Sequence, residues 1–135
     1  MDSLGWWARG RGLQASSSVI VDLDGRIVRC VPDDRGPWTN GEVRNPSARG
    51  KALLARFPGV NPNVHSVTLE AEGFSDGEHP EAQLRSIAWM CRAWMTRHGL
   101  SIEDIYRHSD VDSVERGHCP GPLFEQVVNA LSRDV

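Results

Sequence analysis

Apolar positions in the first third of the chain indicate two short strands. Two runs rich in β-branched residues, 18–22 and 26–31, are separated by Leu23-Asp24-Gly25. Asp-Gly between such runs is a strong hairpin signal, because glycine accepts the positive φ angle that the turn requires. The pattern therefore predicts a β-hairpin over residues 18–31.

Residues 66–72 alternate between apolar and polar, which predicts a third strand. Side chains of a strand point to opposite faces in turn, so Val67 and Leu69 lie on one face. Thr68, Glu70 and Glu72 lie on the other face.

Helices are predicted where apolar residues recur at steps of three and four. The clearest helix runs from Pro80 to His98, and Gly99 is its natural stop. Its apolar stripe comprises Leu84, Ile87, Ala88, Cys91, Trp94, Met95 and His98. Shorter helices are expected over 47–56 and 123–132, the latter with Phe124, Val127, Val128 and Leu131 on one face. The fold class is α/β, a small mixed β-sheet flanked by helices, in a single domain over 1–135.

The charge balance and the lengths of the apolar stretches argue against several classes of function. The 135 residues include 15 basic and 18 acidic side chains, a formal net charge of −3. This balance argues against nucleic-acid binding and against a polybasic membrane anchor. No apolar stretch approaches the roughly 18 residues of a membrane span. Without a visible signal peptide, the chain is expected to be made in the cytoplasm.

Three cysteines, Cys30, Cys91 and Cys119, are present without a Cys-x-x-Cys motif. Their spacing indicates neither a disulfide framework nor a zinc ribbon. Cys30 within a strand and Cys91 on the apolar stripe are expected to behave as small buried hydrophobes. Cys119 is the cysteine expected to be functional.

The residues richest in chemistry lie between His108 and Pro122, in the sequence HSDVDSVERGHCPGP. An imidazole from His108 and a thiolate from Cys119 are good zinc ligands. Spacing alone leaves two interpretations open: a metal site in a loop between helices, or a capped loop around a buried cysteine.

This stretch resembles the closing motif of the zinc-dependent N-acetylmuramoyl-L-alanine amidases, which include phage endolysins, bacterial muropeptide amidases and animal peptidoglycan recognition proteins. Three further segments are similar to that superfamily in the same order: SSSVIVDLDGRIVRCVPDD, GPWTNG and NPNVHSVTLEAEG. The resemblance covers residues 6–131 and is nearest to endolysins of phages infecting actinobacteria. It implies an amidase-like fold, a Zn²⁺ cofactor and bacterial peptidoglycan as the partner, with action at the cell wall.

The resemblance also implies roles for individual residues. His108 and Cys119 match zinc ligands, and Glu70 matches a strand glutamate that acts as general base in some members. Arg116 would supply positive charge near the metal, and the loop Trp38, Thr39 and Asn40 would flank the substrate groove. The alternatives are a solvated strand carboxylate for Glu70, a surface charge for Arg116 and an ordinary turn for the loop.

The sequence departs from the family in its ligand set. Members take a third zinc ligand from a histidine on a strand ahead of the hairpin, and this sequence is expected to lack that strand. Ser17-Ser18 stand where many members have Tyr-His or Ala-His, and Gly117 where many have Lys or Thr. The remaining histidines are not expected to replace the missing ligand; they are His65, His79, His98 and His118.

Three functions compete. The first is a zinc amidase that cleaves the bond between N-acetylmuramic acid and L-alanine. The second is an inactive amidase fold that binds peptidoglycan. The third is a thiol hydrolase with Cys119 as nucleophile and His108 as base. The third is disfavoured, because Pro120 has no backbone N–H to donate to an oxyanion. The oligomeric state is left open.

Overall fold

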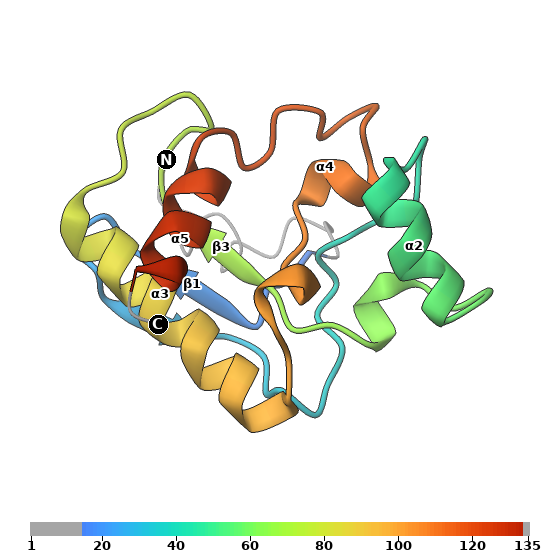
Figure 1. Ribbon diagram of the computed structural model, residues 1–135, viewed down its shortest axis with the longest axis horizontal. Coiled ribbons are helices and arrows are strands. Elements are labelled where there is room, and N and C mark those ends of the chain that lie inside the picture. The colour runs from blue at the N-terminus through green and yellow to red at the C-terminus, as the bar shows by residue number, and fades with distance from the viewer. Residues whose placement is uncertain (1–14, 134–135) are drawn as a thin grey trace.

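Three short strands and four α-helices carry the described part of the chain in a computed structural model that describes residues 15–133 (Figure 1). The strands are β1 (Val19–Val21), β2 (Ile27–Arg29) and β3 (Leu69–Ala71). The helices are α2 (Ala48–Arg56), α3 (Glu81–His98), α4 (His108–Val111) and α5 (Leu123–Ser132), with 3₁₀ turns at Pro62–Val64 and Ile102–Asp104. A helix end expected at Trp6-Trp7 lies outside the described residues.

The sheet has the strand order β2-β1-β3 and is mixed. β1 pairs antiparallel with β2 through the predicted hairpin, and β1 pairs parallel with β3. Gly25 closes the hairpin at a φ of 84°. A Cβ at this position would lie 2.6 Å from the carbonyl oxygen of Ala82 in α3, so the turn needs glycine both for its conformation and for its packing.

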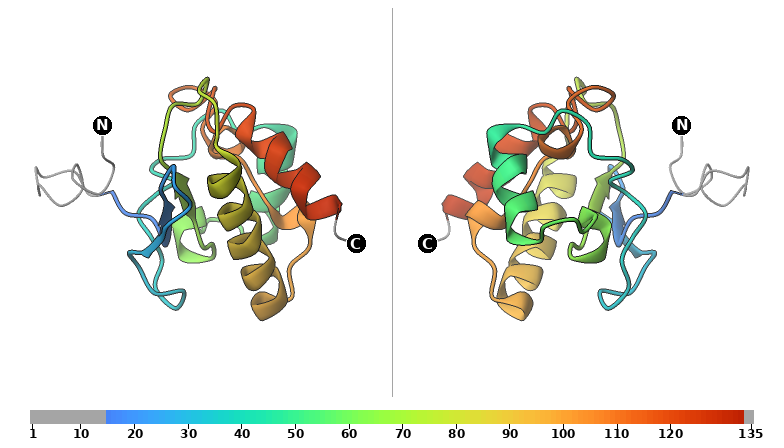
Figure 2. Two further views of the ribbon diagram at one scale, coloured as in Figure 1. Left: turned by 90° about the vertical axis from the view of Figure 1, so that its left-hand side faces the viewer. Right: turned by 90° about the vertical axis from the view of Figure 1, so that its right-hand side faces the viewer.

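The core forms between one face of this sheet and the helices α3 and α5, which lie together on that side of the sheet (Figure 2). Val19 and Val21 contribute from β1, and Ile87, Ala88 and Trp94 from the predicted apolar stripe of α3. The α/β class and the long helix are confirmed.

The core face of α5 differs from the predicted one. Leu123, Val127 and Leu131 are buried, whereas Phe124 lies beside two arginine side chains. The guanidinium carbon of Arg107 is 4.3 Å from the centroid of the Phe124 ring. Both the predicted and the observed faces of α5 have apolar residues at steps of three and four. The contacts of Phe124 with the two arginines distinguish them, because they keep its ring out of the core.

Cys30 and Cys91 differ in their exposure to solvent. Cys30 is exposed at the end of the edge strand β2, where Arg29 is exposed as well, so its predicted burial is wrong. Cys91 is half-buried on α3, and burial raises the pKa of its thiol to about 11. Within residues 15–133, no helix is both long and apolar enough to cross a membrane.

Candidate functional site

The strand β3 presents Glu70 on the face of the sheet that α3 does not cover. Glu70 pairs with Ile20, while Leu69 and Ala71 pair with the core residues of β1 and pack against the core. This confirms the predicted alternation along the strand. Burial raises the pKa of the Glu70 carboxyl, and the positive charge of Arg116 partly opposes the shift.

The segment 108–122 begins with the single helical turn α4 rather than as a loop throughout. The side chain of Asp110 accepts a hydrogen bond from the backbone N–H of Arg107 at 2.9 Å and so caps this turn. Asp112 then reverses the chain by accepting hydrogen bonds from the N–H groups of Val114 and Glu115, at 3.1 and 3.0 Å. The sequence was correct in placing the segment between helices, but the local caps extend helical structure to His108.

The two ends of this segment meet. The backbone N–H of Ser109 donates a hydrogen bond to the carbonyl oxygen of Cys119 at 3.2 Å. His108 and Cys119, both half-buried, therefore belong to adjoining stretches of backbone. The convergence of their side chains on one point remains a prediction.

Arg116 lies close enough to influence three of the candidate groups. Its charge lowers the pKa of Glu70, of the His108 imidazole and of the Cys119 thiol. One cation therefore acts on the strand glutamate and on both ends of the segment 108–122. The negative charge of Glu70 also raises the pKa of Cys119, which places these two groups near each other.

Burial is the largest influence on both candidate ligands. It lowers the pKa of His108, which favours the neutral imidazole, and it raises the pKa of Cys119, which favours the thiol. A hydrogen bond from His108 to the backbone of Asn40 and the charge of Asp112 oppose the shift of the imidazole. A neutral imidazole with one nitrogen engaged by the backbone offers its other nitrogen as a metal ligand.

The loop Trp38-Thr39-Asn40 lies beside His108 through the same hydrogen bond. Asn63, which is 2% exposed, holds the loop by accepting hydrogen bonds from the N–H groups of Thr39 and Asn40, at 3.1 and 2.8 Å. The side chain of Trp38 is 54% exposed and is available to a partner. The loop is therefore anchored next to His108, and its part in a substrate groove stays a prediction.

Thr68 joins this loop to the sheet. Its hydroxyl lies 2.7 Å from that of Thr39, and it accepts a hydrogen bond from the N–H of Ser18 at 3.2 Å. The hydroxyl of Ser17 donates to the carbonyl oxygen of Thr68 at 3.0 Å. Sequence reasoning did not select Thr68 or Asn63, although Thr68 shares the outward alternation of Glu70 and Asn63 opens the Asn-x-x-Ser element.

The other described histidines have different neighbours. His65 stacks on Phe57 with ring centroids 4.1 Å apart, and His79 Nδ1 lies 2.9 Å from Gln83 Oε1. His98 Nε2 is 3.7 Å from Asp33, and His118 is exposed. Across residues 15–133, no group of three or more His, Cys, Asp or Glu side chains is arranged to hold a metal ion.

Comparison with known proteins gives this geometry a family context. A family model described as N-acetylmuramoyl-L-alanine amidase matches residues 3–122. Two curated relatives are the 1,6-anhydro-N-acetylmuramyl-L-alanine amidases AmpD of Citrobacter freundii and Enterobacter cloacae, which are 27% and 26% identical over 113 residues. Each match covers 84% of this chain and 54% of the relative, so the chain spans about half the length of these proteins.

Solved structures share the fold. A selenomethionine derivative of AmpD superposes with a TM-score of 0.72 at 25% identity, covering 96% of this chain and 66% of AmpD. The Escherichia coli amidase AmiD, solved with anhydro-N-acetylmuramic acid-L-Ala-D-γ-Glu-L-Lys, has a TM-score of 0.72 at 21% identity, covering 96% of this chain and 52% of AmiD. The small mixed sheet with its covering helices is therefore the fold of these amidases.

Proposed function

The chain belongs to the N-acetylmuramoyl-L-alanine amidase family, and on that premise we propose that it hydrolyses the amide bond between N-acetylmuramic acid and L-alanine in peptidoglycan. The observation that carries the proposal is the backbone hydrogen bond from Ser109 to Cys119, which brings together the stretches that carry His108 and Cys119. The charge of Arg116 acts on both of these groups and on Glu70, which comes from a strand far away in the sequence. This shared electrostatic influence supports a single reaction centre.

The proposal includes zinc. His108 and Cys119 would hold the ion, and a third ligand would have to come from outside the described residues. Bound zinc with an open position acidifies a water molecule and polarises a carbonyl group. Burial of both side chains favours tight binding, because a metal ion relieves the cost of a buried thiolate.

The chain's own residues account for proton transfer and charge. A carboxylate whose pKa is raised towards neutrality is suited to accept a proton and to return it, so Glu70 would take the proton of the attacking water and deliver it to the leaving amine nitrogen. Arg116 would stabilise negative charge on the carbonyl oxygen. The exposed indole of Trp38 would contact the glycan or the peptide along the groove.

The source of the substrate is a second part of the proposal. The sequence resembles endolysins of phages infecting actinobacteria, and this resemblance supports polymeric cell-wall peptidoglycan as the substrate. We propose that the chain is made in the cytoplasm and acts on the bacterial wall. Curated relatives named for the 1,6-anhydro sugar make the soluble muropeptide the competing substrate. Parallel digestion of insoluble wall and of anhydro-muropeptide separates the two.

A binding module without catalysis is the second candidate function. It is favoured by the observation that residues 15–133 contain no complete metal cluster. A thiol hydrolase is less well supported, because burial raises the pKa of Cys119 and so reduces the nucleophilic thiolate.

Zinc binding tests the proposal against both alternatives. Equilibrium dialysis of the purified chain should detect zinc, and His108→Ala and Cys119→Ala should each weaken binding at least tenfold, as expected for loss of a direct ligand. His118→Ala, an exposed neighbour, is the matched control and should bind zinc as the unchanged chain does. Equal zinc affinity in all four proteins would remove His108 and Cys119 from the ligand set.

A further inference from the structure

A second concave feature lies away from the candidate site, between the hairpin and α3. This pocket has a volume of about 440 Å³. Its walls come from the strands through Val19, Ile27 and Arg29, from the following loop through Asp33, and from α3 through Trp89, Met90, Ala93, Trp94 and Arg97. The volume falls within the range of small-molecule and sugar-sized sites.

The pocket and the candidate site lie on opposite faces of the sheet. Val19 pairs with Arg29 and Val21 with Ile27, so the strand residues of the pocket share the face that α3 covers. Glu70 lies on the other face, at the other side of the sheet order β2-β1-β3. A ligand in the pocket would not occupy the reaction centre.

The interior of the pocket is apolar, and its rim carries an exposed aromatic side chain. Met90 and Trp94 are buried at 4% and 6% exposure, whereas the indole of Trp89 is 60% exposed at the edge of the helix. An exposed tryptophan beside a hollow offers a flat apolar surface, and tryptophan and arginine are enriched where proteins bind partners.

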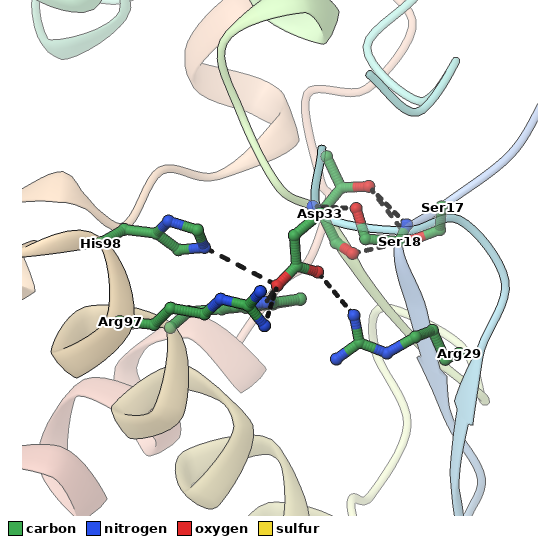
Figure 3. A network of polar contacts seen from close by, with 8 residues as sticks. Ser17, Ser18, Arg29, Asp33, Arg97 and His98 are labelled. Atoms are coloured by element: carbon green, nitrogen blue, oxygen red, sulfur yellow. Dashed lines mark hydrogen bonds and ion pairs between the residues drawn. The ribbon is translucent and has the colours of Figure 1, made fainter. Parts of the chain in front are cut away.

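Two arginines are held at this rim by one buried carboxylate. The Asp33 side chain is 5% exposed and lies 2.9 Å from Arg29 NH1 and 3.4 Å from Arg97 NH1 (Figure 3). The indole N–H of Trp94 donates to the same carboxylate at 3.3 Å, which fixes its position. Arg29 and Arg97 remain 49% and 66% exposed, so both can reach a ligand while Asp33 orients them.

We propose that this pocket is a second peptidoglycan contact, which receives the ring face of a sugar on Trp89 and a stem-peptide carboxylate on Arg29 and Arg97. The inference rests on the proposed function for its choice of polymer. Peptidoglycan supplies both chemistries, since the ligand of the AmiD complex joins a muramic acid ring to a peptide containing D-γ-Glu. Two arginines against one aspartate make the rim positive on a chain of net charge −3, which suits an acidic polymer.

A second contact has a clear use for an enzyme that acts on an insoluble polymer. Two contacts on one strand raise the effective concentration of the bond to be cleaved, provided that the polymer spans both. The pocket should therefore contribute measurably to binding of the wall, where both contacts lie on one polymer, and only weakly to binding of a short soluble fragment, which fills one contact at a time. This difference is the basis of the test.

The experiment compares the double variant Trp89→Ala/Arg97→Ala with the unchanged chain by cosedimentation with purified insoluble peptidoglycan and by calorimetry with soluble muramoyl-tripeptide. The double variant should need at least about fivefold more peptidoglycan for half-saturation, a fraction of the effect of a typical interface hot spot. The affinity of the soluble tripeptide for the candidate site should be unchanged. Trp89→Phe, which keeps an aromatic ring, and Arg85→Ala, an arginine of α3 that is 73% exposed outside the pocket, are the matched controls.

Any other result would contradict the inference, and four such results can be told apart. Equal sedimentation of the double variant and the unchanged chain would overturn the second contact and leave the proposed function standing. Parallel loss of polymer and tripeptide binding would show that the pocket variants disturb the candidate site. Failure of the unchanged chain to bind either ligand would overturn the proposed function as well. Self-association of the unchanged chain that the double variant abolishes, with equal wall binding, would assign the pocket to a second copy.

Discussion

Glu70 shows how the position of one residue sets both its charge and its use. Its folded-state pKa is raised, mainly by burial, so its contribution to stability is fully present below the unfolded pKa of about 4.3 and is lost as the pH rises through the folded value. At pH 7 the ionised side chain therefore costs stability in the fold. This is the pattern of a residue kept for chemistry rather than for stability.

Replacement of Glu70 by Gln should relieve that cost. We expect the free energy of unfolding of Glu70→Gln, relative to the unchanged chain, to be more favourable at pH 7 than at pH 4. Urea denaturation at the two pH values measures the difference, and Glu78→Gln, at an exposed position, should show a smaller dependence. A relative stability that is the same at both pH values would contradict the burial of this carboxylate.

The cysteines give a residue-scale prediction that corrects the sequence-based one. Cys30 is exposed, whereas Cys91 is half-buried and has a pKa of about 11, which leaves about one thiolate in a thousand at pH 8. Alkylation of the native chain followed by peptide mass mapping should modify Cys30 first and Cys91 last. Slower modification of Cys30 than of Cys91 would show that the end of β2 is covered.

At the scale of elements, α3 is the helix on which the fold depends most. Ile87 is 3% exposed in the core, so Ile87→Ala should destabilise the protein by about 2–5 kcal/mol through lost burial and a residual cavity. Leu84→Ala should cost less, since Leu84 is only partly buried. Urea denaturation measures both; unchanged stability of Ile87→Ala would mean that α3 does not form the core described.

A polar residue of α3 should matter as much as an apolar one. Gln83 is fully buried, and its amide nitrogen donates to the carbonyl oxygens of Val21 and Glu72 at 3.0 and 2.9 Å. Gln83→Leu would leave these groups with fewer partners and should cost about 1–3 kcal/mol in the same assay. A stability gain would show that the hydrogen bonds to β1 and β3 contribute little.

The amphipathic pattern of the sequence was sufficient to predict the hairpin, the long helix that stops at Gly99 and the strand that carries Glu70. Each of these elements has a distinct period or turn residue. The pattern could not find Gln83, since buried polar groups follow partners rather than a period. The pattern placed Phe124 in the core, because hydrophobicity alone does not indicate a cation–π contact with an arginine.

At the scale of the whole molecule, the sequence predicted the segments of the candidate site, and the fold brings the two ends of the segment 108–122 together. Asn63 and Thr68, which anchor the loop 38–40, depend on contacts across the chain that spacing does not encode. The rim formed by Arg29, Asp33 and Arg97 joins the hairpin to the far end of α3, which no local pattern predicts.

The central claim is that Glu70, His108 and Cys119 form the centre of a zinc-dependent amide hydrolase. The most direct test incubates the chain with muramoyl-tripeptide and zinc and identifies the products by mass spectrometry. The account predicts hydrolysis at the muramoyl–L-alanine bond, with a free alanine amine. Glu70→Gln in the same protein should release none of this product while retaining zinc. Cleavage at another bond, or equal cleavage by the Glu70→Gln protein, would contradict the account.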